Sequence, residues 1–216
     1  MKVAGPTAAL AGVPAGIQGA GPWLGRRQLF VRFAAEAETA TMFTAAALCQ
    51  ELSRLAQRAA YHSIAISGRD PLANCEYLAA VLKEPAPLPV MLDTDGERPE
   101  ELAKIVGKLQ MVQVTVTGAP SDSWLERALA SVQAAASHGV AHALVLCPNE
   151  QVTDSLLLRA VEQVHGVSDK AEVVVHPPLD AAIGKDRRWV TLLERAAAVH
   201  PDVRLMLRLP APVGMR

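Results

Sequence analysis

Seven short stretches of the chain carry the hydrophobic pattern of β-strands. In residues 28–33, Leu29, Val31 and Phe33 alternate with residues that face the other way, as in a half-buried strand. Residues 141–146 are nearly all apolar, which is typical of a strand buried on both faces. The predicted strands are 28–33, 63–67, 89–93, 112–117, 141–146, 172–175 and 203–207.

Helical patterns lie between these strands. Leu48, Leu52 and Leu55 recur at i, i+4 and i+7 and predict a helix over residues 43–60. Asp70 is a favourable N-cap and Pro71 a favourable first helical residue, so we expect a second helix to begin there. The remaining predicted helices are 99–109, 121–137, 151–165 and 189–199.

Strands that alternate with helices form βαβ units with right-handed crossovers, and these build a parallel sheet. We therefore expect an α/β fold, an open or partial (β/α) barrel of six or seven mostly parallel strands, with a doubly wound sheet as the alternative. Residues 1–18 are rich in Gly, Pro and Ala and are expected to form an irregular arm. Residues 19–216 are expected to form one domain.

Composition and cysteine spacing limit which partners and which cellular compartment are expected for the chain. The net charge of −1 supplies no global field to attract nucleic acid, so no nucleic-acid partner is expected. No apolar run approaches the ~20 residues of a membrane span. Cys49, Cys75 and Cys147 form no CxxC pair, which argues against a disulfide framework or a compact zinc site. A reducing compartment, the cytoplasm or an organelle matrix, is the expected location.

Four ordered stretches carry a family resemblance. They are IQGAGPWLGRRQLFVRFA at 17–34, SGRDPL at 67–72, LDTDG at 92–96 and the C-terminal DVRLMLRLPAPVGMR. The chain resembles the 7-carboxy-7-deazaguanine synthases, radical S-adenosylmethionine enzymes of queuosine-type 7-deazapurine biosynthesis, over nearly its whole length. The resemblance implies a radical-SAM-like partial barrel and a homodimer.

The positions that would carry the family's chemistry differ. The three cysteines that bind the iron–sulfur cluster in the family fall on Glu36, Ala40 and Phe43. An iron–sulfur cluster of this type needs thiolate ligands, so we expect no cluster, no radical and no cofactor. The glutamate of the family's QGEG run is Ala20, and the pair associated with magnesium is replaced at 44–45. We expect helix-forming sequence to occupy the former metal loop.

Other family positions are retained and form a possible residual ligand site. Arg32 could hold a carboxylate or purine edge, or it could be an inherited buried arginine that pairs with a carboxylate of the chain itself. Gly68 precedes a predicted helix start, which suits either an anion site or an ordinary turn. The residues of this possible site are Gln18, Gly19, Arg32, Gly68, Asp70, Thr94 and Gly96.

Two further groups could support chemistry at the barrel mouth. Asp70, Asp93, Asp95 and Glu150 follow predicted strands and could bind Mg²⁺ or act as acid and base, although scattered loop carboxylates usually cap turns. His176 stands before two prolines and is expected to be structural.

His138 and His142 have the i, i+4 spacing of a zinc pair. Gly139 lies between them and is expected to end the helix, so the two side chains would not share a face. We therefore expect no metal site here.

These observations favour a catalytically inactive relative of the synthases that serves as a structural or regulatory subunit of a dimer or larger assembly. Two alternatives stay open. One is a binding module for a deazapurine, nucleotide or S-adenosylmethionine-like ligand, and the other is a cluster-free enzyme that uses the mouth carboxylates.

Overall fold

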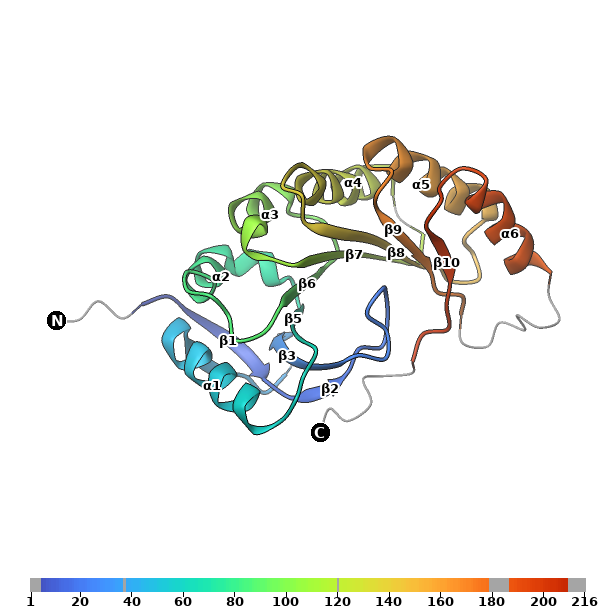
Figure 1. Cartoon of the computed structure of the whole chain (residues 1–216). Helices are drawn as coiled ribbons and strands as arrows, with labels where there is room; N and C mark the ends of the chain where they lie inside the picture. Colours follow the sequence, from blue (N-terminus) through green and yellow to red (C-terminus); the bar gives the residue numbers. More distant parts are fainter. Residues whose placement is uncertain (1–4, 37, 120, 179–186, 210–216) are drawn as a thin grey trace.

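The computed structural model describes residues 5–36, 38–119, 121–178 and 187–209. In this part of the chain a single ten-stranded sheet curves into an open barrel, and the helices lie along its convex side (Figure 1). The strands are β1 (Thr7–Gly12), β2 (Ala15–Ile17), β3 (Arg27–Phe33), β4 (Thr41–Thr44), β5 (Ser63–Gly68), β6 (Val90–Thr94), β7 (Met111–Thr117), β8 (Ala141–Cys147), β9 (Glu172–Val175) and β10 (Val203–Leu205).

The helices alternate with the later strands. They are α1 (Ala45–Arg58), α2 (Cys75–Val81), α3 (Pro99–Ile105), α4 (Asp122–Ser137), α5 (Asp154–Val167) and α6 (Arg188–Ala197), with the 3₁₀ turns η1 (Pro71–Asn74) and η2 (Val106–Lys108). Each main helix overlaps a helix predicted from the sequence, because the apolar periodicity that defines it also packs it on the sheet.

The strand order is β10-β9-β8-β7-β6-β5-β3-β1-β4, and β2 pairs with β3. All pairings from β3 through β5 to β10 are parallel, so the seven predicted strands form one parallel sheet. Helices along one face of a curved sheet are the arrangement of a partial barrel and not of a doubly wound sheet (Figure 1). The predicted partial (β/α) barrel is therefore confirmed.

The expectation of an irregular arm was wrong for residues 5–18, and residues 1–4 lie outside the described residues. Thr7–Gly12 lies between β3 and β4, with Leu10 opposite Phe33 and Ala8 opposite Phe43. Ala8 and Leu10 alternate with exposed residues and are buried. Because this strand is built mostly from alanine and glycine, its own sequence gives a weak strand signal, and pairing with β3 determines its structure.

The segment that the resemblance assigns to the metal loop is not helical throughout, contrary to the expectation. Residues 41–44 form β4, the last strand of the sheet, and α1 begins only at Ala45. Thr44 caps α1, because its Oγ1 accepts a hydrogen bond from the Ala47 N–H at 3.1 Å. The predicted helix start at residue 43 was therefore two residues early, on a segment that pairs with β1.

Apolar side chains pack on both faces of the sheet. The main core lies between the sheet and the helices and includes Leu29, Leu48, Leu92 and Leu144. A smaller cluster on the concave face consists of Phe30, Ala65, Met91 and Met111, with Trp23 packed against it. Among the described residues no helix is long and apolar enough to cross a membrane.

Candidate functional site

The carboxyl ends of the parallel strands meet at one edge, and a small cavity opens there. Its volume is about 180 Å³, and its lining includes Asp70, Asp93 and Asp95, three of the four predicted mouth carboxylates. Glu150, the fourth, is exposed and is not part of this lining. No group of three or more His, Cys, Asp or Glu side chains in the described ranges is arranged to hold a metal ion.

Asp93 differs chemically from the other mouth carboxylates. Its Oδ1 accepts a hydrogen bond of 2.7 Å from Thr115 Oγ1, which in turn accepts one of 3.2 Å from Gln113 Nε2. Burial raises the pKa of Asp93, and the hydrogen bonds from these two side chains oppose that rise. Burial thus favours the protonated form of Asp93.

Asp70 does not cap a helix, contrary to the sequence-based expectation. It adopts a left-handed conformation with φ 41°, and its side chain makes no capping hydrogen bond. Arg98 binds the carboxylate instead, through Nε at 2.9 Å and Nη2 at 2.7 Å. A bidentate arginine competes successfully with the backbone N–H groups for this carboxylate. Pro71 does begin the 3₁₀ turn η1, as predicted.

Gly68 has a packing role. Its φ is +103°, and a Cβ placed here would lie 2.3 Å from the carbonyl oxygen of Phe33. The Arg69 N–H donates to the same oxygen at 3.1 Å. That N–H is consequently not free to bind an anion, and the turn is explained by the close approach of β5 to β3.

Thr94, at the end of β6, holds the turn at Gly96, and Gly96 contacts α4. Thr94 Oγ1 accepts a hydrogen bond from the Gly96 N–H at 3.2 Å, and Ser131 Oγ donates to the Gly96 carbonyl at 2.9 Å. A Cβ on Gly96 would lie 2.7 Å from Ala128 Cα. Thr94 lines the small cavity with Gly68 and Asp70, whereas Gly96 packs against the helix.

The segment that begins at Gln18 covers the concave face. Gln18 is buried and its Nε2 lies 3.9 Å from Met91 Sδ. The Gly19 carbonyl accepts a hydrogen bond from the Leu209 N–H at 3.0 Å, which ties this segment to the C-terminal one. Neither Gln18 nor Gly19 lines the small cavity at the mouth.

Gly21 and His176 form a long-range contact that sequence reasoning missed. The Gly21 N–H donates to His176 Nε2 at 2.9 Å, and His176 Nδ1 lies 2.8 Å from the Met206 carbonyl oxygen. Since that carbonyl can only accept, Nδ1 carries the proton and the ring is neutral. Burial lowers the pKa of His176, in agreement with this assignment. His176 thus links Gly21 to the segment at Met206, and its structural role stays a prediction.

Comparisons with known proteins agree on one family. No family model matches the chain. The chain is 30% identical over 114 residues to the 7-carboxy-7-deazaguanine synthase of Methanothermobacter thermautotrophicus, a match that covers 46% of this chain and 45% of that protein. The match thus spans less than half of the relative's length. The crystal structure of QueE from Escherichia coli has the same fold, with a TM-score of 0.55 and 15% identity over 94% of this chain and 95% of that one. Over part of its length the chain is therefore similar in sequence to a 7-carboxy-7-deazaguanine synthase, and it shares the fold of QueE.

The positions that the resemblance assigns to the cluster cysteines lie between the end of β3 and the start of α1. Glu36 and Ala40 are exposed, and Phe43 lies in β4 and packs against the main core. The thiols lie elsewhere. Cys49 is on α1, where its Sγ donates to the Val81 carbonyl at 3.5 Å, and Cys75 and Cys147 are buried.

Arg32, the retained arginine of the synthase-like strand β3, pairs with a carboxylate of the chain itself. Its Nη2 lies 2.8 Å from Glu38 Oε1, and Glu38 Oε2 accepts the Ala35 N–H at 3.1 Å. The Ala35 hydrogen bond and the Arg32 charge both lower the pKa of Glu38. Of the two interpretations of Arg32, the internal pairing is the one observed, in a partly exposed position.

Arg208 is the cationic residue at the mouth of this synthase-like barrel. It lines a cavity of about 360 Å³ with Thr117, Cys147, Asn149 and His176, and three prolines complete the wall. It makes no hydrogen bond or ion pair with any other residue that the structure describes. Burial raises the pKa of Cys147, and the nearby Arg208 charge opposes the rise. The sequence analysis did not predict Arg208 as a site residue, because the C-terminal stretch supplied only a family resemblance and no residue role.

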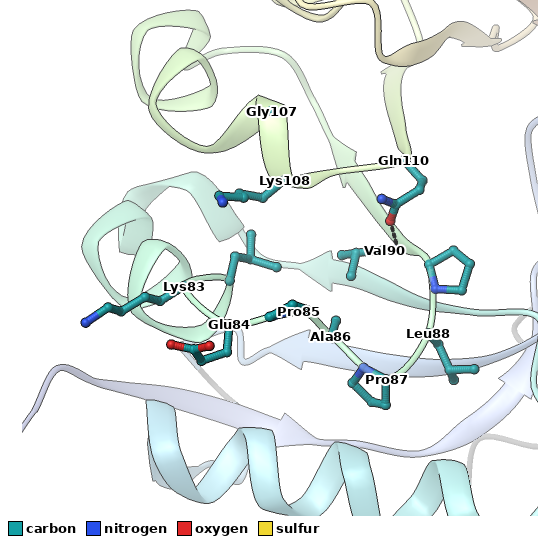
Figure 2. A pocket seen from close by; sticks show the side chains of 12 residues that line it. Lys83, Glu84, Pro85, Ala86, Pro87, Leu88, Val90, Gly107, Lys108 and Gln110 are labelled. Atoms are coloured by element: carbon teal, nitrogen blue, oxygen red, sulfur yellow. Dashed lines mark hydrogen bonds between the residues drawn. The ribbon is translucent and has the colours of Figure 1, made fainter.

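A third hollow, of about 540 Å³, lies at the amino ends of the strands, where β6 begins (Figure 2). The loop at 82–89 forms one wall, and Lys108 and Gln110 lie on the other. Gln110 Oε1 accepts the Val90 N–H at 2.7 Å, and Lys83 and Lys108 extend to the same side (Figure 2). This hollow is separate from the mouth and contains none of the predicted site residues.

Proposed function

We propose that the chain is a non-catalytic radical-SAM-like protein that acts as a structural or regulatory subunit of a dimer or larger assembly. The loop between β3 and α1 carries the proposal. The three positions that match cluster cysteines hold Glu36, Ala40 and Phe43, and none of these side chains can supply a thiolate to iron. Without a cluster no electron reaches S-adenosylmethionine.

The strand that replaces part of this loop supports a role in assembly. β4 ends the sheet, so one of its edges has no partner strand in the described part of the chain. Met42 on this strand is 63% exposed. A free strand edge with an exposed apolar side chain is a favourable place for another chain to dock.

The catalytic half of the proposal is tested by anaerobic reconstitution with ferrous iron and sulfide, followed by iron and sulfide analysis and absorbance spectroscopy. The unchanged chain is expected to bind no cluster. The matched variant Glu36→Cys/Ala40→Cys/Phe43→Cys asks whether thiolates alone are missing from the loop. Stoichiometric iron and sulfide on the unchanged chain would overturn the proposal.

The assembly half is tested by light scattering on the protein purified gently from its natural source. We expect a mass greater than one chain. Met42→Lys should lower the associated fraction, because a charge on an edge strand opposes strand pairing. Val190→Lys, at an exposed apolar position of α6, is the control and should have no effect. A free monomer under native conditions would contradict this half.

Arg208 favours a second candidate, a binding module for a deazapurine, nucleotide or S-adenosylmethionine-like ligand. Arg208 lines a cavity whose wall also includes three prolines, a suitable setting for an anionic or polar group on a flat ligand. Calorimetric titration with these three ligand classes tests it. Arg208→Gln should weaken binding more than Arg208→Lys, and absence of heat across the set would count against this candidate.

A further inference from the structure

Two histidines outside the mouth meet at close range. His165 is in the last turn of α5, and His200 follows α6 shortly before β10. Their Nδ1 atoms are 3.1 Å apart, and their ring planes cross at 79°. His200 is fully buried, whereas His165 is exposed, so solvent reaches the pair from one side.

The protonation of His200 follows from its other nitrogen. Nε2 lies 2.6 Å from the carbonyl oxygen of Ala171, and a carbonyl oxygen can only accept. Nε2 therefore carries a hydrogen, and in the neutral ring Nδ1 has a lone pair that points toward His165. In the absence of any other ligand, His165 Nδ1 donates its hydrogen to this lone pair.

We propose that His165 and His200 form a chelating site for a divalent transition metal ion, which binds between the two Nδ1 atoms. At a metal–nitrogen distance of about 2.0–2.1 Å and a tetrahedral angle, the two nitrogens would be ~3.3 Å apart. The observed 3.1 Å is a few tenths of an ångström short of this distance. The ring centroids are 5.3 Å apart, so the two Nδ1 atoms point nearly at each other, and the exposed His165 ring must turn for both nitrogens to reach one ion. His165 must also move its hydrogen from Nδ1 to Nε2, by exchange with water.

The surroundings of the pair match those of known imidazole ligands. A histidine that binds metal commonly donates its other ring N–H to a backbone carbonyl, as His200 does to Ala171. Nearby His142 is not a third ligand, because Val140 O at 2.7 Å and Ser168 Oγ at 2.8 Å occupy its nitrogens. Water from the exposed side completes the coordination.

The donor set determines which ions bind. Two neutral imidazoles and water suit Cu²⁺, Ni²⁺ and Zn²⁺, and they do not suit Mg²⁺ or Ca²⁺, which prefer oxygen ligands. A bound ion would connect the end of α5 to the segment between α6 and β10. Because both histidines are brought together only by folding, binding stabilises the folded state.

Thermal unfolding with zinc chloride, and with magnesium chloride for comparison, tests the site. At zinc concentrations about tenfold above the dissociation constant, the melting temperature should rise by ~2–4 °C. Magnesium should cause no rise. His165→Gln should remove the zinc response, and His138→Gln, an exposed histidine at the end of α4, should keep it.

Electron paramagnetic resonance with Cu²⁺ supplies a readout that does not depend on stability. The unchanged chain should show hyperfine coupling to two imidazole nitrogens, and His165→Gln should lose the two-nitrogen pattern. The proposal is overturned if millimolar zinc leaves the melting temperature unchanged, or if His165→Gln responds to zinc and copper as the unchanged chain does.

Discussion

The contact between Gly21 and the concave face makes Gly21→Ala a sharp test of how the N-terminal segment is held. Gly21 has φ +75°, and a Cβ here would lie 1.9 Å from Gln113 Oε1 and 2.6 Å from its Cδ. Gln113 is fully buried, and its Nε2 is bound to Thr115, so it cannot move aside freely. The added methyl group must therefore displace the segment or the glutamine.

Two costs add in this variant. A non-glycine residue at positive φ costs about 1–2 kcal/mol, and overpacking of a buried contact typically costs about 1–3 kcal/mol. Displacement of Gly21 also weakens the hydrogen bond from its N–H to His176 Nε2. We expect the free energy of unfolding to fall by about 2–5 kcal/mol.

Gly25→Ala is the matched control. Gly25 has φ +81°, but nothing lies within 4 Å of the place its Cβ would take, so only the conformational cost of about 1–2 kcal/mol applies. Urea unfolding followed by tryptophan fluorescence measures both variants, since Trp23 lies between the two glycines in the sequence. If Gly21→Ala loses no more stability than Gly25→Ala, the close packing on Gln113 is refuted.

Three further predictions concern pH and the core. Burial lowers the pKa of His176, so the unfolded state binds more protons than the folded state below the ordinary histidine pKa of about 6.5. The free energy of unfolding should therefore fall as pH drops through that value. His176→Gln should flatten this pH dependence, measured by urea unfolding between about pH 7 and 5. Burial raises the pKa of Asp93, so the stability that its protonated form contributes is full below about pH 3.9 and is lost as pH rises through the raised value. Asp93→Asn should therefore be more stable than the unchanged chain at neutral pH. A loss of stability there would contradict the burial argument. Leu10→Ala should cost about 2–5 kcal/mol by denaturant unfolding, because Leu10 is fully buried, and a negligible cost would indicate that β1 is not part of the core.

The parallel sheet was predictable from the sequence because its strands and helices carry strong local patterns. The three antiparallel strands at the N-terminus were not. β1 and β2 consist largely of small residues, and β4 has four residues, so their structure depends on pairing with distant strands. Leu10 is buried only because Phe33 lies opposite it.

The details of the mouth were less predictable, because they depend on contacts between residues far apart in the chain. Asp70 has the sequence context of a helix cap, but Arg98 takes its carboxylate. Gly21 and His176 are separated by 155 positions and carry no shared motif. A single sequence shows which residues could bond, and only the fold shows which competing partner is within reach.

The retained family positions have a packing explanation that does not require ligand binding. A side chain on Gly68 would meet the backbone of β3, and one on Gly96 would meet α4. Thr94 holds the Gly96 turn through its hydroxyl group. Packing alone accounts for these residues, so their presence is no evidence for catalysis. Chemistry at the mouth has to be argued from Arg208 and Asp93, which the packing of the barrel does not require.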